Sequence, residues 1–426
     1  MNKSILIKTG RSQDVQFPLK NGAGSDAIHS TPIYAYAVCK LQTDTSLEGI
    51  GLAFTLGAGN RLVCGAIDYL VRHVEGKEIN ELMADFGTTY KRMADDPNLR
   101  WLGPHKGVIH LALASVVNAC YDLWAKSRNQ PLWQLLLELS PEELTNTLDF
   151  SYYEEVLSKE EAISLMKSQQ AGKNKRMGIL KKGYPGYDTS IGWFNYSDEQ
   201  LTNNIKKSID QGFTALKLKV GSREAERDLR RAELVRKTAG TKATIMLDAN
   251  QQWNLPKAIS TCKKLMAIDP YWIEEPTHPD DVQAHITLSK EVPIPIALGE
   301  HVPNKIMFKN FILSGSMAFN QVDAVRVGGV SEFILISLLS KKYNIPVVPH
   351  VGDMGQIHQH LVLFNHISVG HPALLLEHIP HLKSHFKFPA QVVDGKYSTP
   401  QEPGMSTDFK DHVQEKKPFP IKFHRV

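Results

Sequence analysis

The chain of 426 residues is 42% hydrophobic, and its 49 basic side chains nearly balance 45 acidic ones, which leaves a formal net charge of +4. This length suits two domains, and because the charge is spread without a basic block we expect no nucleic-acid partner. Residues 1–10 lack the apolar centre of a signal peptide, and no stretch is read as a membrane span. The four cysteines lie far apart without metal-site spacing, so we expect a cytoplasmic protein with buried thiols and no membrane partner.

Residues 1–140 are predicted to form an α+β domain that caps the rest of the chain. Residues 5–7, 33–41 and 51–55 alternate in the manner of an antiparallel sheet. Residues 61–74, 79–93 and 106–128 carry apolar positions at helical spacing. The loop of residues 17–31 is rich in turn-forming residues, and taken alone it favours a plain connector over a lid that closes on a ligand.

Residues 141–183 are predicted to be a charged, helical insertion between the domains. They contain basic runs at residues 173–176 and 181–182. Such runs are usually solvated surface, so we expect no chemistry there.

From residue 184 the pattern changes to short apolar strands alternating with amphipathic helices, which predicts parallel βα units. Eight strands are expected at residues 185–190, 215–220, 244–250, 271–276, 295–300, 321–327, 346–350 and 373–377. Helices are expected between them at residues 198–211, 223–239, 256–268, 280–291, 304–314, 331–343 and 356–367. The predicted fold class is therefore α/β, a (β/α)8 TIM-type barrel over residues 184–390, and residues 391–426 are expected to return to the cap.

An ionisable residue recurs once per predicted strand from the second strand onward: Lys219, Asp248, Glu274, Glu300, Asp323, His350 and Glu377. Consecutive members are about one βα unit apart, so all of them can reach the carboxyl ends of the strands, where barrel active sites lie. This shared register, more than any single motif, indicates a functional site.

Lys217 and Lys219 are two residues apart on one predicted strand and therefore point the same way. Two neighbouring ammonium groups disfavour protonation, which is expected to lower a lysine pKa and to suit Lys219 to general-base work. Without the register described above, two solvated lysines on an edge strand would be the simpler interpretation.

Asp248, Glu274 and Glu300 are predicted to converge from three consecutive strands. Oxygen ligands without imidazole or thiolate suit a hard cation, so we expect Mg²⁺, with Mn²⁺ as an alternative. Carboxylates paired with lysines inside the barrel are the structural alternative. Asn250 shares the face of Asp248 and could orient a hydroxyl group.

Asp323 on the sixth predicted strand and His350 at the end of the seventh are expected to meet, so that the carboxylate fixes the imidazole tautomer. A buried structural pair is the alternative. With Lys219 and His350 on either side of a cation, the site fits removal of a proton α to a carboxylate. The cation, Lys217 and a protonated Glu377 would then stabilise the enolate.

Five barrel motifs resemble the enolase superfamily, mandelate racemase subgroup: Lys217-Leu-Lys219, Leu247-Asp-Ala-Asn-Gln251, Trp272-Ile-Glu-Glu-Pro276, Leu298-Gly-Glu-His301 and Asp323-Ala-Val-Arg-Val-Gly-Gly329. Loop motifs such as Gly24-Ser-Asp26, Trp101-Leu-Gly-Pro104 and Tyr184-Pro-Gly-Tyr187 are, within that subgroup, most similar to the L-fuconate dehydratases.

The resemblance implies a magnesium-dependent hydro-lyase acting on a small acid sugar, most closely L-fuconate, which would become 2-keto-3-deoxy-L-fuconate. Lys219 would remove the C2 proton, and His350, oriented by Asp323, would protonate the departing 3-hydroxyl. Asp248, Glu274 and Glu300 would bind magnesium. The substrate would be held by Gly24, Ser25, Asp26, Tyr34, Lys217, Asn250, Glu300, His350, Val351, Gly352 and Glu377.

One stretch departs from the family pattern. After His350 the chain reads Val351-Gly-Asp-Met-Gly-Gln-Ile-His358, where the pattern has a smaller, glycine-rich loop that ends in Leu-Cys-Glu. Contacts to the distal part of the sugar could therefore differ. Dehydration of another acid sugar, racemisation or epimerisation at C2, and a non-catalytic metal-binding barrel stay open as alternatives, and so does assembly into a homo-oligomer.

Overall fold

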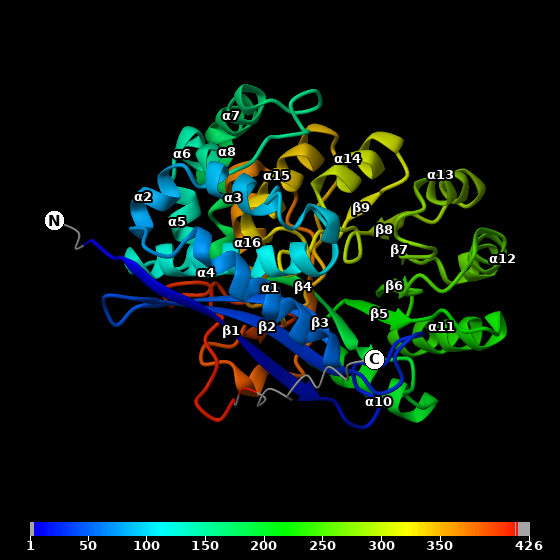
Figure 1. Cartoon of the computed structure of the whole chain (residues 1–426). Coiled ribbons are helices and arrows are strands. Elements are labelled where there is room, and N and C mark those ends of the chain that lie inside the picture. The colour runs from blue at the N-terminus through cyan, green and yellow to red at the C-terminus, as the bar shows by residue number, and fades with distance from the viewer. Residues whose placement is uncertain (1–3, 414, 416–426) are drawn as a thin grey trace, which may run out of the picture.

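A three-stranded antiparallel sheet forms the base of the cap in the computed structural model, which describes residues 4–413 and 415. The strands are β1 (Ile7–Pro18), β2 (Ile33–Thr43) and β3 (Glu48–Leu56), in the order β1-β2-β3 (Figure 1). The first strand is much longer than its predicted residues 5–7, because it pairs with β2 from Ile7 to Pro18 although many of its side chains are polar.

The cap helices are α1 (Asn60–Leu70), α2 (Ile79–Ala84), α3 (Phe86–Ala94), α4 (Gly107–Ser127) and α5 (Leu132–Glu138). Helix α4 lies directly on β3, where a Cβ on Gly51 would come within 1.9 Å of the Ser115 carbonyl oxygen, so only glycine allows this approach. By length and composition α4 could cross a membrane, contrary to the sequence expectation. Its apolar side chains are instead buried in the cap.

Four short helices follow between the cap and the barrel: α6 (Pro141–Asn146), α7 (Lys159–Ser168), α8 (Gln170–Arg176) and α9 (Ile179–Lys182). The serines before α6 and α7, Ser140 and Ser158, each form a reciprocal capping box with a glutamate three residues on. Helix α7 packs against the barrel helix α15 (Gly329–Lys342) (Figure 1).

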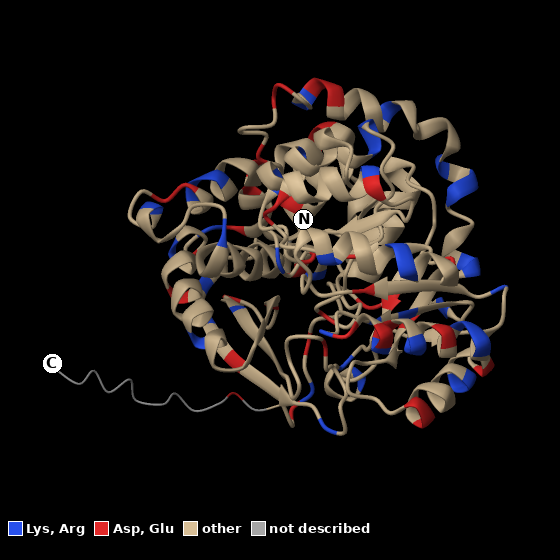
Figure 2. Cartoon of the chain, turned by 90° about the vertical axis from the view of Figure 1, so that its right-hand side faces the viewer, with Lys and Arg blue, Asp and Glu red and all other residues tan. Residues whose placement is uncertain are grey.

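The barrel strands are β4 (Tyr184–Gly192), β5 (Ala215–Lys219), β6 (Thr244–Asp248), β7 (Trp272–Glu274), β8 (Ile296–Leu298), β9 (Phe319–Asn320) and β10 (Leu376–His378). They are parallel neighbours in chain order from β4 to β9, and β10 pairs with β4. The helices between them are α10 (Asp198–Asp210), α11 (Ala225–Ala239), α12 (Leu255–Leu265), α13 (Val282–Glu291), α14 (Lys305–Ser314), α15 (Gly329–Lys342) and α16 (His358–Phe364), which continues as a π-helical turn (Asn365–Val369). In the view of Figure 2, basic and acidic residues are interspersed along the helices.

One predicted strand is wrong in position, and another is reduced to a single bridge. The sixth lies at Phe319–Asn320 rather than at residues 321–327, because the chain turns at Asp323: its carboxylate accepts from the Val325 amide at 2.8 Å, and its carbonyl accepts from Arg326. Residues 346–350, which the structure describes throughout, form only a parallel bridge from Val347 to Asn320. The valine-rich composition of these segments is typical of buried strands.

The barrel interior is filled from below by an apolar layer of Tyr187, Ala215, Met246, Trp272, Ala297 and Val348. Because side chains two residues apart share a face of a strand, Lys217, Asp248 and Glu274 lie one layer above Ala215, Met246 and Trp272. The apolar layer thus closes the bottom of the barrel and leaves the charged layer at its carboxyl end.

The cap is fixed to the barrel beside the Asp323 turn. The Phe54 amide of β3 donates to the Val325 carbonyl at 3.1 Å, and Asn118 of α4 donates to the carbonyls of Leu52 and Ala324. After the barrel, β11 (Val392–Val393) and β12 (Lys396–Tyr397) form a hairpin against β4. The chain then reaches the cap again, where the Thr407 hydroxyl donates to the Ile50 carbonyl at 2.7 Å.

Candidate active site

Lys217 and Lys219 project into the barrel among carboxylates. Lys217 Nζ lies 2.7 Å from both Glu274 Oε1 and Glu377 Oε1, and Lys219 Nζ lies 2.5 Å from Asp248 Oδ2. The expectation of lowered lysine pKa values is wrong for this arrangement. Burial does lower the two lysine pKa values, but the neighbouring carboxylates outweigh burial and raise both above the ordinary value.

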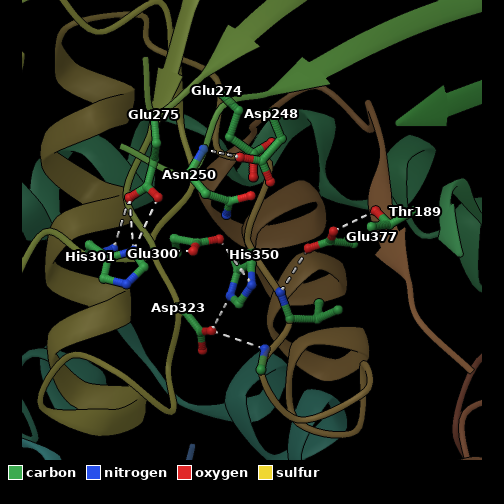
Figure 3. A network of polar contacts seen from close by, with 12 residues as sticks. Thr189, Asp248, Asn250, Glu274, Glu275, Glu300, His301, Asp323, His350 and Glu377 are labelled. Carbon is green, nitrogen blue, oxygen red and sulfur yellow. Dashed lines mark hydrogen bonds and ion pairs between the residues drawn. The ribbon is translucent and has the colours of Figure 1, made fainter. Parts of the chain in front are cut away.

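The three predicted metal ligands converge. Asp248, Glu274 and Glu300 are buried, and each offers a carboxylate oxygen within 4.8 Å of the others (Figure 3). Burial and the Asp248 charge raise the pKa of Glu274 to about 8. Nearby, Asn250 Oδ1 is buried without a hydrogen-bond partner among the residues that the structure describes. Crowded carboxylates with an unpaired amide oxygen fit a hard divalent cation such as Mg²⁺.

His350 lies between two carboxylates, as Figure 3 shows. Its Nδ1 is 2.6 Å from Asp323 Oδ2, and its Nε2 is 3.1 Å from Glu300 Oε2. Burial opposes a charge on the ring, but Glu300 and Asp323 raise the pKa of His350 to about 9. The imidazolium is therefore the favoured form near neutral pH, and its Nε2–H faces the carboxylate cluster.

Glu377 is held as a carboxylate, contrary to the expectation that it is protonated. Besides Lys217, it accepts from the Thr189 hydroxyl at 2.5 Å and from the Val351 amide at 3.3 Å. Burial raises its pKa, but Lys217 and His350 outweigh burial and lower the pKa below the ordinary value. Glu377 is therefore not the proton donor expected for an enolate, whereas the Lys217 ammonium beside it keeps its positive charge.

The predicted lid loop lines the cavity above these groups. Gly24, Asp26 and Tyr34 line the cavity together with Lys219, Asn250, Glu300, His350 and Glu377. The loop conformation requires a glycine at Gly24, which has a φ of +71° and whose Cβ would come within 2.5 Å of Leu19. The contacts of Gly24 and Asp26 with the cavity favour the lid over the plain connector.

Four predicted substrate contacts do not line the cavity. Ser25 is fully buried, and its hydroxyl donates to the Gly22 carbonyl at 2.6 Å and accepts from the Asn195 amide at 2.9 Å. The amides of Val351 and Gly352 donate to Glu377 and Asp323. Lys217 lies beneath the cavity among its carboxylate partners. These residues support the site from behind.

The sequence reading missed Trp193, Gln251, His301 and Arg326, which also line the cavity. His301 Nδ1 is 3.1 Å from Glu300 Oε1, so Glu300 has an imidazole on each side. A signal was available for His301, which directly follows Glu300 in the chain. Asn250, Gln251 and Glu275 have φ values of 45°, 61° and 41°, a strained geometry that often accompanies functional sites.

Two family descriptions match the chain. Residues 18–136 match the mandelate racemase / muconate lactonizing enzyme N-terminal domain, and residues 200–413 match the enolase C-terminal domain-like family. Mitochondrial enolase superfamily member 1 of Homo sapiens is 40% identical over 96% of this chain and 94% of its own length. Its crystal structure superposes with a TM-score of 0.94 and covers 97% of this chain and 96% of that chain.

L-galactonate dehydratase of Hypocrea jecorina is 39% identical over 98% of this chain and 95% of its own length. L-talarate/galactarate dehydratase of Salmonella typhimurium, crystallised with Mg and L-lyxarohydroxamate, shares the fold at a TM-score of 0.77 and 23% identity, over 98% of this chain and 96% of that chain. The matched residues extend through cap and barrel, and the chain belongs to the mandelate racemase subgroup of the enolase superfamily.

Proposed function

We propose that this protein is a magnesium-dependent acid-sugar dehydratase, with L-fuconate as its substrate. One observation carries the proposal: Lys219 and His350 line the same cavity and contact opposite ends of the carboxylate cluster. Lys219 contacts Asp248 and His350 contacts Glu300. A substrate carboxylate placed at the cluster would therefore have a candidate base and a candidate acid on its two flanks.

Asp248, Glu274 and Glu300 would hold Mg²⁺, which when bound supplies positive charge for the substrate carboxylate. Neutralising the cluster also removes the attraction that keeps Lys219 protonated, because Asp248 is its closest partner. Lys219 would take the C2 proton, and the nearby Lys217 ammonium would stabilise the enolate. His350 would then give its Nε2 proton to the 3-hydroxyl as the C3–O bond breaks, and the enol product tautomerises to the 2-keto acid.

The choice of sugar rests on the cavity wall and on the relatives. L-Fuconate is 6-deoxy-L-galactonate, so it shares the configuration of the substrate named for the Hypocrea jecorina relative and differs by a methyl group in place of a hydroxymethyl group. Ile28, Leu56 and Ile379 line the cavity and would suit a methyl group. L-Galactonate is the second candidate, since His301 and Arg326 offer polar partners in the same cavity.

The test is turnover by the purified protein with magnesium and a panel of acid sugars, followed as formation of 2-keto acids. The panel contains L-fuconate, L-galactonate, D-arabinonate and galactarate. We expect the highest kcat/KM for L-fuconate and no keto acid with excess chelator. A higher kcat/KM for L-galactonate would move the assignment to that acid. Racemisation at C2 without keto acid would contradict dehydration.

A further inference from the structure

A second imidazole and carboxylate pair lies behind Asp323, on the side away from His350. His358 Nε2 is 3.1 Å from Asp323 Oδ1, and His358 Nδ1 is 2.7 Å from Asp353 Oδ1. The side chains of these three residues are fully buried. Polar groups therefore follow one another without a break from Asp353 through His358 and Asp323 to His350.

Both aspartates of this series are held by the backbone. Asp353 accepts from the amides of Gly355, at 2.9 Å, and of Ile357. Asp323 Oδ2 accepts from the Gly352 amide at 3.0 Å as well as facing His350. On the other oxygen, Oδ1, His358 is the only side-chain partner among the described residues, beside the Val325 amide.

The protonation of His358 decides what it does for Asp323. The Ala324 amide also points at His358 Nε2, at 3.0 Å, and an unprotonated Nε2 would accept from it. A protonated Nε2 would instead donate to Asp323. Burial opposes a charge on the ring, but Asp353 and Asp323 raise the pKa of His358 to about 10. The attraction of the imidazolium to two carboxylates therefore outweighs the single hydrogen bond that the Ala324 amide could donate to a neutral ring. The imidazolium then bridges the two aspartates.

We propose that His358 and Asp353 are positioning residues that fix the Asp323 carboxylate and, through it, the orientation of His350. The inference rests on the proposed function for its kinetic consequence only. Residues 351–358 do not line the cavity, so neither residue can touch a substrate there. Asp353 and His358, which lie in the stretch that departs from the family pattern, thus contact the support of the acid and not the sugar.

The test compares His358→Gln with His360→Gln in the magnesium-loaded protein. His360 is a matched control, because it is a buried histidine on the same helix, with contacts only to the Trp133 amide and the Ser406 hydroxyl among the described residues. The first readout needs no substrate. A 2.6 Å bond between His350 Nδ1–H and Asp323 should give a low-field proton resonance, which we expect to shift and to exchange faster in His358→Gln and to stay unchanged in His360→Gln.

The second readout is kinetic. Elimination by His358→Gln should have a kcat about 10- to 100-fold lower, by analogy with the loss of a partner that orients a metal-ligating histidine. KM and the exchange of the C2 proton with solvent should stay unchanged, because Lys219 has no contact with the series. His360→Gln should keep the wild-type kcat.

An unchanged low-field resonance in His358→Gln would overturn the proposal, and so would equal losses of exchange and elimination, which indicate general damage to the fold. If the resonance moves but wild-type protein dehydrates no acid sugar, the positioning role stands and the proposed function fails. Should His358→Gln not fold, Asp353→Asn keeps an oxygen for His358 Nδ1–H, and it should shift the same resonance in the same direction by less.

Discussion

Lys219 and His350 are assigned different steps, so their variants should fail differently. Lys219→Ala removes the base, and we expect it to lose both elimination and exchange of the C2 proton with deuterated solvent. His350→Asn keeps the base and the carboxylate cluster. It should still exchange the C2 proton while eliminating about 10²- to 10⁴-fold more slowly, which is the usual value of general acid assistance.

Proton NMR of the substrate recovered from heavy water separates the two losses. The wild-type protein and both variants are compared at equal magnesium concentration, with unfolding midpoints as a check on the fold. Exchange by Lys219→Ala together with none by His350→Asn would mean that the two roles are reversed.

At the scale of elements, the loop between β1 and β2 should act as a lid. Asp26 orders this loop, since its Oδ1 accepts from the amides of Ile28 at 2.7 Å and of His29 at 2.6 Å. Asp26→Ala should therefore lower kcat/KM by roughly tenfold or more, which is the effect expected from the loss of one or two hydrogen bonds to a charged group. The variant should stay folded.

Asp44→Ala is the matched control for the lid, because Asp44 also accepts from a backbone amide, that of Leu6 at 3.0 Å, in a loop of the cap away from the cavity. It should retain the wild-type kcat/KM. Equal kinetics of Asp26→Ala and wild type would return the loop to a plain connector.

The contact between α4 and α15 should make the stability of the interface between cap and barrel depend on pH in the acid range. His110 Nε2 lies 2.7 Å from Glu332 Oε2, and both side chains are buried. Burial raises the Glu332 pKa, but His110 and Lys305 outweigh burial and lower it to about 2. A carboxyl with a lowered folded pKa stabilises the fold above its unfolded pKa and loses that contribution as the pH falls towards the folded value.

The free energy of unfolding of the wild-type protein should therefore fall by roughly 3 kcal/mol between about pH 5 and pH 2 as Glu332 becomes protonated, at about 1.4 kcal/mol for each unit of pKa difference. Glu332→Gln should be less stable at pH 7 and should show a shallower loss of unfolding free energy towards acid pH. Glu142→Gln, at an exposed pair with Lys167, serves as the control. A variant Glu332→Gln with the full wild-type slope would contradict the assignment.

At the scale of the whole molecule, periodicity predicted the barrel and the register of its charges well. Lys219, Asp248 and Glu274 end short strands, and their side chains meet because side chains alternate along a strand. The pattern misled around Asp323, where a valine-rich segment is typical of a strand, because the turn depends on a hydrogen bond from the Val325 amide to Asp323 that no sequence pattern reports.

Protonation was the least predictable property. The pair Lys217 and Lys219 suggested lowered pKa values, but the carboxylates that reverse the shift lie on other strands and at distant positions in the chain. The same holds for Glu377, whose charge is fixed by Lys217. The contact of His358 with Asp323 joins residues on two different segments of the barrel, so its role could be seen only in three dimensions.

Magnesium should stabilise the entire fold, because three buried carboxylates converge, and burial together with the Asp248 charge raises the pKa of Glu274 to about 8. A cation that binds only the folded state at a free concentration of 100 times its Kd adds about 2.7 kcal/mol. The unfolding midpoint should rise with magnesium and fall back with excess chelator. In Glu274→Gln this rise should vanish, whereas Glu291→Gln, at an exposed pair with Lys263, should keep it. A full magnesium-dependent rise in Glu274→Gln would place the stabilising cation away from Asp248, Glu274 and Glu300, and the proposed chemistry would then lose its charge centre.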